Sequence, residues 1–149
     1  MNETNPPAEI IPLILILFPI AFGLLWFSVL SLISRIGGWH RLAQTYPDQN
    51  VPENYSDVMS SGRMGWMNYS GVLKLHAGIR GLHLGVILPF RPGHAPICLP
   101  WNALQVHEGS HLWFRLSRLE IQYQGRTIAK LQIRSATAEG LRLNERASG

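Results

Sequence analysis

The sequence predicts an N-terminal transmembrane α-helix followed by a mainly-β domain, built as a curled antiparallel sheet or a small barrel with a short C-terminal helix. Three observations lead to this fold class. Residues 10–33 carry no charge, residues 82–90 alternate in apolar character, and turns rich in glycine and proline separate short apolar segments after residue 62. Of the 149 residues 46% are hydrophobic and only 15% are charged, against about 25% charged in an ordinary soluble domain. A membrane segment accounts for this excess, and the rest of the chain holds one small domain, too short for a multi-domain enzyme.

The apolar run of residues 10–33 is long enough to cross a bilayer. Its 24 residues would form a helix of about 36 Å at about 1.5 Å per residue. We assign the spanning helix to residues 10–36 and an extracytoplasmic tail to residues 1–9. A cleaved signal peptide is the alternative, but the tail contains Glu3 and Glu9 and no Lys or Arg, and the run is longer than the apolar core of a signal. We therefore expect an uncleaved anchor.

Basic residues give the expected orientation. Arg35 and Arg41 follow the apolar run, and no basic residue precedes it. Lys and Arg beside a spanning helix stay on the cytoplasmic side. We therefore expect a single-pass protein of the inner (cytoplasmic) membrane, with the N-terminus outside and the C-terminal domain in the cytoplasm. The single cysteine, Cys98, agrees with a reducing compartment.

Between membrane and domain, the sequence predicts a juxtamembrane amphipathic helix over residues 37–47. Four of its residues are spaced to share one helical face, namely Trp39, Leu42, Ala43 and Tyr46. This face lies either on the cytoplasmic membrane interface, where Trp and Tyr are favoured, or on the domain itself. Residues 48–61, with proline, asparagine and serine, are expected to be a linker.

The β domain is expected over residues 62–149, and its first half predicts a meander of strands. The expected elements are a strand over residues 67–75 with a bulge at residues 70–71, a turn over residues 77–81, a strand over residues 82–90 and a loop at Arg91-Pro92-Gly93-His94. A return strand begins at Ile97. It must bend at Pro100, because proline cannot donate to a ladder.

In the second half of the domain, the apolar alternation changes phase. Leu112, Phe114 and Leu116 share one face, but the next apolar residues start at Leu119. This change predicts a bulge at residues 117–118. The final segment, from residue 135 onward, contains helix formers and predicts a short helix.

The hairpin after this strand has two candidate registers. A two-residue loop would place Leu119 opposite Lys130, whereas a three-residue loop over residues 124–126 places Leu119 opposite Leu131. The second register keeps apolar residues together on one face of the sheet. We therefore expect the register that pairs Leu119 with Leu131.

Three consecutive segments of the domain carry a family resemblance. The strand over residues 81–90, the loop Arg91-Pro92-Gly93-His94 and the segment Ile97-Cys98-Leu99-Pro100-Trp101 form a pattern that resembles bacterial pleckstrin-homology-like (PH-like) and GRAM-like domains. The whole chain is similar to a group of small bacterial single-pass membrane proteins with one N-terminal helix followed by Gly38-Trp39-His40-Arg41-Leu42-Ala43. The resemblance implies a PH-like cytoplasmic barrel that serves as a binding or assembly module, and it implies no catalytic residues. The C-terminal segment is shorter than the long capping helix of PH domains, so an open curled sheet remains the alternative to a closed barrel.

One motif is typical of metal chemistry. His107-Glu108-Gly109-Ser110-His111 matches the His-Glu-x-x-His pattern of zinc metallopeptidases, in which a helix brings both imidazoles to the metal and the Glu polarises the bound water. Alternating apolar residues flank this segment, and Gly109-Ser110 predicts a turn. We expect a hairpin loop without a metal here. A membrane-bound zinc metallopeptidase using His107, Glu108 and His111 is the alternative.

A thiol enzyme is also not expected. Cys98 would need a nearby histidine such as His83 or His94, but a single cysteine in an apolar segment more often packs as a small hydrophobe. The two Asp residues of the chain, Asp48 and Asp57, both lie in the predicted linker, so the domain has no Asp to complete a catalytic triad. We expect no enzymatic activity and no cofactor.

Charge is the remaining indication of function. From residue 62 onward there are 11 Lys and Arg and four Glu, a net charge of +7, and a domain held at the inner leaflet meets a negative surface. We expect a non-enzymatic binding or assembly module on the lipid bilayer that contacts a protein partner or anionic lipid headgroups. Nucleic acid is not an expected partner because no aromatic and basic binding motif is present, and an accessory subunit of a membrane complex is a further alternative. The expected contact residues are Trp39, Arg91, His94, Trp101 and Arg115.

Overall fold

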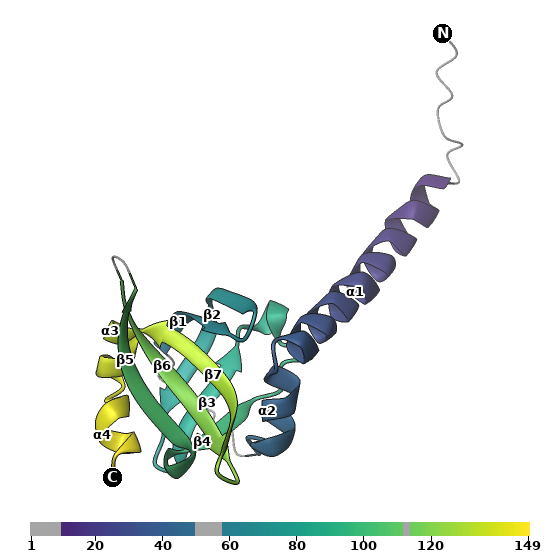
Figure 1. Ribbon diagram of the computed structural model, residues 1–149. Coiled ribbons are helices and arrows are strands. Elements are labelled where there is room, and N and C mark those ends of the chain that lie inside the picture. The colour runs from purple at the N-terminus through teal and green to yellow at the C-terminus, as the bar shows by residue number, and fades with distance from the viewer. Residues whose placement is uncertain (1–9, 50–57, 112–113) are drawn as a thin grey trace.

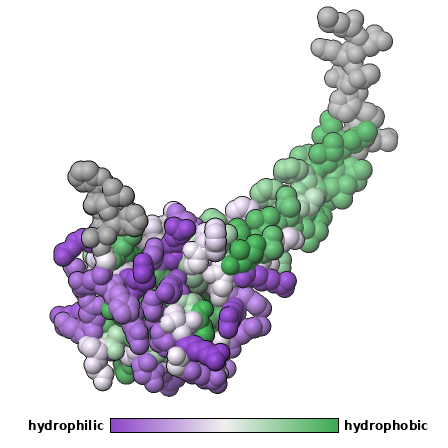
Figure 2. Space-filling model, viewed as in Figure 1, coloured by the Kyte–Doolittle hydropathy of each residue, from purple (hydrophilic) through white to green (hydrophobic). Residues whose placement is uncertain are grey.

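The computed structural model describes residues 10–49, 58–111 and 114–149. A long helix leads into a β domain (Figure 1). Helix α1 (Ile10–Ile36) extends away from the domain and is long and apolar enough to cross a membrane. None of its most apolar stretch is buried by the rest of the protein. Figure 2 shows apolar surface along α1, while the visible face of the domain is largely polar. The predicted N-terminal helix is confirmed.

Helix α2 (Trp39–Thr45) confirms the second, short helix, and its apolar face packs on the β domain. Trp39 and Leu42 are only 0% and 1% exposed. The indole N–H of Trp39 donates to the carbonyl oxygen of Ala95 at 2.8 Å. The alternative in which this face lies on the membrane interface is therefore wrong, because the domain core already covers the indole ring and satisfies its N–H group.

Seven antiparallel strands form one curled sheet in the order β4-β3-β2-β1-β7-β6-β5. The strands are β1 (Val58–Met64), β2 (Met67–Ala77), β3 (Gly81–Val86), β4 (Ile97–Pro100), β5 (Leu104–His111), β6 (Phe114–Tyr123) and β7 (Arg126–Arg134). Among the described residues the edge strands β4 and β5 do not pair, so the sheet is open and the closed barrel is wrong. The outer edge of β4 is already occupied, since Cys98 N donates to Tyr46 O at 3.0 Å and Asp48 N donates to Pro96 O at 3.1 Å.

Both ends of the predicted linker, residues 48–61, belong to the fold. Its first residue, Asp48, is held at the edge of β4, and its last four residues are strand, because β1 begins at Val58. Short polar side chains suggested a linker, but the backbone of β1 is satisfied by pairing with β2 and β7. The domain therefore begins before residue 62.

The predicted bulge in β2 is confirmed. Ser60 pairs with Leu73, whereas Gly62, two residues later, pairs with Tyr69, four residues away. The extra residues of β2 include Gly71, whose φ of +66° suits glycine. The turn predicted over residues 77–81 is also confirmed, because β2 ends at Ala77 and β3 begins at Gly81.

The strand predicted over residues 82–90 ends early, at Val86. Residues Leu88–Phe90 instead form a short 3-10 helix, η1. Pro89 has no N–H group for a ladder, and its carbonyl oxygen accepts a hydrogen bond from the Trp26 indole of α1 at 3.0 Å. The bend at Pro100 is confirmed, since a second 3-10 helix, η2 (Trp101–Ala103), leads from β4 into β5.

The bulge predicted at residues 117–118 is absent. Strands β5 and β6 pair without a shift from Leu104 and Ile121 to His111 and Phe114. Ser117 occupies a core-facing position, 2% exposed, and its hydroxyl donates to Ser135 Oγ at 3.2 Å. The change of phase in the sequence therefore marks a buried hydroxyl pair in a regular strand.

The hairpin between β6 and β7 has the expected register, with Leu119 opposite Leu131. Its loop, however, has two residues, Gln124 and Gly125, with φ values of 50° and 74°. Two positive φ values are typical of a type I′ turn. The strands keep the apolar register through a bulge next to Ile121.

Two short helices, α3 (Ser135–Gly140) and α4 (Leu143–Ala147), replace the single predicted C-terminal helix. The chain breaks between them at Arg142, whose φ is 50°. Ala138 and Leu143 are 3% and 0% exposed and belong to the same core as the sheet and α2. The core is therefore enclosed by the concave sheet and three short helices.

Candidate functional site

A hollow of about 910 Å³ opens where the end of α2, the turn between β2 and β3, and strand β4 meet. Strand β3 runs from this turn to η1, which contacts α1, so the hollow lies toward the end of β3 remote from α1. Arg80 and Arg146 line it and are exposed. The hollow therefore faces away from α1 and carries positive charge at its mouth.

Three side chains that can transfer protons or bind metal ions form a row across neighbouring strands along this hollow. His76 on β2 is the pairing partner of His83 on β3, and His83 is in turn the partner of Cys98 on β4. Residues directly opposite one another in a sheet lie on the same face, with Cβ atoms about 4.5–5.5 Å apart. The ring centroids of His76 and His83 are 5.8 Å apart. We call His76, His83 and Cys98 the polar row.

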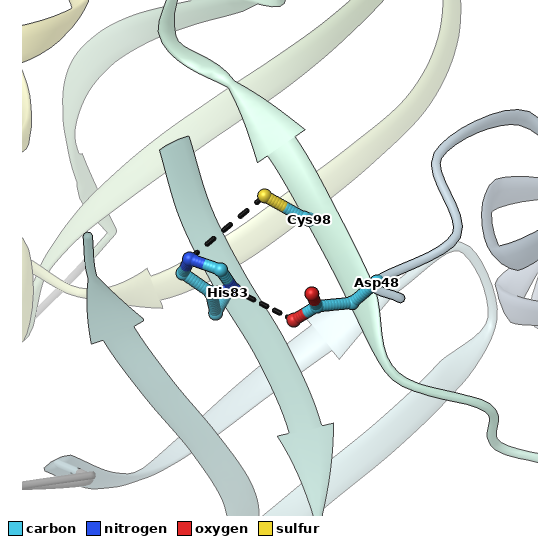
Figure 3. A network of polar contacts seen from close by, with 3 residues as sticks. All are labelled: Asp48, His83 and Cys98. Carbon is cyan, nitrogen blue, oxygen red and sulfur yellow. Dashed lines mark hydrogen bonds and ion pairs between the residues drawn. The ribbon is translucent and has the colours of Figure 1, made fainter. Parts of the chain in front are cut away.

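Asp48 completes this site from a segment that the sequence assigns to a linker. Its carboxylate oxygen Oδ2 lies 2.6 Å from His83 Nδ1, and His83 Nε2 lies 3.9 Å from Cys98 Sγ (Figure 3). The side chains of His83 and Asp48 are 12% and 4% exposed. The expectation that no Asp joins the domain is therefore wrong, because the pairing of residues 46–48 with β4 carries Asp48 to His83.

The contact with Asp48 indicates which nitrogen of the His83 ring carries the proton. An ionised carboxylate only accepts hydrogen bonds, so Nδ1 of His83 must donate to Asp48, and this leaves Nε2 directed at the sulfur. Such an arrangement can either take the thiol proton or present a lone pair to a metal ion. Burial raises the pKa of the Cys98 thiol, the negative charge of Asp48 raises it further, and Arg80 opposes them. The thiol therefore stays protonated near neutral pH, which does not favour a reactive nucleophile.

The five predicted contact residues do not come together. Trp39 is fully buried, and His94 is 2% exposed, with Nε2 3.2 Å from the Tyr69 hydroxyl, so neither side chain is available to a partner. Trp101 is half-buried and donates to Gly78 O at 3.2 Å. Arg91 and Arg115 are exposed on separate parts of the domain.

The zinc motif is not formed. Residues 107–111 belong to β5 in full, so the hairpin loop expected at Gly109-Ser110 is also wrong. Four residues along a strand span about 13 Å, which separates the backbones of His107 and His111 too widely for one ion. The helix that the metallopeptidase alternative requires at these residues is therefore replaced by a strand.

A second contact of interest joins α1 to the domain. The ring of Trp26 lies 5.7 Å from that of Phe90, and Leu30 and Ser34 are 3% and 1% exposed. The hydroxyl of Ser34 donates to the carbonyl oxygen of Gly93. We call this contact, between residues 26–34 of α1 and residues 89–93 of the loop, the α1 seam. No sequence signal indicated that the loop after β3 would pack on the apolar helix.

Comparison with known proteins gives no match to a protein-family model, to a curated protein or to a solved structure. The polar row with Asp48 and the α1 seam are therefore the two observations on which functional proposals rest.

Proposed function

We propose that the chain is a single-pass protein of the inner membrane whose β domain serves as a non-enzymatic binding module on the cytoplasmic face. The observation that carries this proposal is the α1 seam. The domain contacts only the last part of α1 and leaves the rest as exposed apolar surface (Figures 1 and 2). A helix of this kind needs a lipid environment.

The α1 seam also supports an anchor over a removable signal peptide. Cleavage after the apolar run would remove Trp26 and Leu30 from the domain and expose the loop that packs on them. Burying one leucine side chain alone stabilises a protein by about 1.5–3 kcal/mol. A segment that contributes to the fold in this way is better retained than removed.

The depth of the α1 seam supports a domain seated directly on the bilayer. From Ile10 to Trp26 the helix rises about 24 Å, and the hydrocarbon core is about 30 Å thick. With Ile10 at the outer border, Trp26 and the η1 residues beside it then lie about 6 Å inside the cytoplasmic border of that core, where Leu88, 80% exposed in the protein alone, meets lipid. Trp66, 84% exposed, belongs to the turn whose Gly65 approaches Gly37 at the end of α1.

Basic residues accompany these apolar ones. Arg35 in the last turn of α1, Arg63 beside the β1–β2 turn and Arg91 after η1 are all exposed. Each basic side chain near an anionic leaflet contributes about 1 kcal/mol. These residues favour contact with anionic headgroups, and the positive flank of α1 favours the cytoplasmic side.

The remaining surface is available to a protein partner. The hollow with Arg80 and Arg146 faces away from α1 and suits an acidic segment of such a partner. The sheet consists of two meanders, β1–β4 and β5–β7, which pair through β1 and β7 and are followed by the C-terminal helices. This arrangement is compatible with a PH-like module in which β4 and β5 do not pair within the described residues.

Capture of partners from membranes in mild detergent tests the proposed binding function. We expect the full chain to retain a partner that is lost when Arg80 and Arg146 are both changed to Glu. The matched control is Arg134→Glu, an exposed arginine at the end of β7, which should retain it. Equal capture by the double variant and by Arg134→Glu contradicts binding at the hollow. Failure of the parent chain to capture any partner also contradicts it.

A further inference from the structure

We infer that the polar row is a transition-metal site of the zinc class, in which Cys98 Sγ and His83 Nε2 are ligands and Asp48 orients His83. This inference does not depend on the membrane orientation or on the proposed partner.

The spacing of the two ligand atoms fits a metal ion. Zinc binds sulfur at about 2.3 Å and imidazole nitrogen at about 2.0–2.1 Å, so two such ligands in a tetrahedral site lie about 3.6 Å apart. The observed distance between His83 Nε2 and Cys98 Sγ is 3.9 Å, a few tenths of an ångström more. One potential metal-binding atom from each of Asp48, His83 and Cys98 lies within 4.8 Å of the other two.

Asp48 provides the support that metal-binding histidines have. A ligating imidazole usually donates its other N–H to a carboxylate, which fixes its tautomer and makes the metal-facing nitrogen more basic. The short contact between Asp48 Oδ2 and His83 Nδ1, 2.6 Å, is of this kind (Figure 3). This contact involves Nδ1 only, and it orients the ring so that Nε2 faces the sulfur.

A candidate third ligand and an entry path lie beside these two residues. His76 is the next member of the row, its ring 5.8 Å from that of His83, and all these residues line one hollow that opens to solvent. A thiolate with two imidazoles is a donor set that suits zinc and copper.

Zinc binding by the full chain in detergent micelles tests this inference, with competition against a chromophoric chelator as the readout. We expect one equivalent of zinc to bind, and cobalt in its place to give a thiolate-to-metal charge-transfer absorption. Cys98→Ser and His83→Gln should abolish both signals. Asp48→Asn should weaken binding by about 10–100-fold, while the control His107→Gln, which changes an exposed side chain on β5, should leave it unchanged.

Three results overturn the inference. The first is zinc binding that survives in Cys98→Ser, and the second is a parent chain that binds no more zinc than this variant. Because serine differs from cysteine by one atom, circular dichroism of Cys98→Ser should match that of the parent and exclude unfolding as the cause. The third is rapid alkylation of Cys98 by iodoacetamide at neutral pH that depends on His83 and is not slowed by zinc, since this would identify a reactive thiol instead.

Discussion

Replacing Gly93 with alanine tests how closely the domain holds α1. Gly93 has a φ of +74°, and an added Cβ would lie 2.8 Å from Cα of Ser31 in the helix backbone. The left-handed conformation costs a non-glycine residue about 1–2 kcal/mol. The contact with Ser31 can be relieved only if the loop moves away from α1, which exposes Leu30 at a cost of about 1.5–3 kcal/mol. We expect Gly93→Ala to lower the free energy of unfolding by about 2.5–5 kcal/mol.

Gly71→Ala is the matched control. Gly71 has a similar φ of +66°, but nothing lies within 4 Å of an added Cβ, so this variant should lose only the conformational cost of about 1–2 kcal/mol. Urea unfolding of the full chain in micelles measures both losses, and hydrogen exchange over residues 87–94 should accelerate in Gly93→Ala alone. Equal losses in the two variants, with unchanged exchange over that loop, would refute the α1 seam.

Three further predictions concern the domain. Trp39→Ala should destabilise it by about 3–5 kcal/mol because a fully buried ring is removed, whereas exposed Arg91→Ala should change stability by less than about 0.5 kcal/mol; thermal melts compare them, and similar melts would contradict the core position of Trp39. Burial lowers the pKa of His94, against the effect of hydrogen bonds to the backbone at Pro92 and Phe90, so the folded state binds the proton less tightly than the unfolded state. The free energy of unfolding should therefore fall as the pH drops below about 6.5, and this decrease, followed by urea titration, should be smaller in His94→Gln. Gln124→Asn should stabilise the hairpin by up to about 1 kcal/mol, because Asn-Gly is favoured in a type I′ turn; a lower urea midpoint would contradict that turn type.

Local patterns predicted the elements whose residues follow one regular period. The uncharged run gave α1, and the requirement that Leu119 and Leu131 share a face gave the register of the last hairpin. The alternation of residues 82–90 also predicted β3, but it continued past Val86, where the missing N–H of Pro89 and the contact with Trp26 take over. At Ser117 the reverse occurred, since a buried hydroxyl pair interrupted the apolar pattern of a continuous strand.

The candidate metal site could not be predicted because its residues meet only through tertiary structure. Asp48 and His83 are 35 positions apart, and the contact depends on an isolated bridge between Pro47 and Ile97. One part was accessible: pairing the apolar positions of β3 with those of β4 places His83 opposite Cys98. The linker composition of residues 48–61 concealed the contribution of Asp48.

Protease accessibility in sealed cells tests the central claim most directly. When protease is added outside intact spheroplasts that carry the full chain, we expect the β domain to stay whole, and to be digested only after the inner membrane is opened. Loss of the domain from intact spheroplasts would place it outside the cytoplasm and contradict the account.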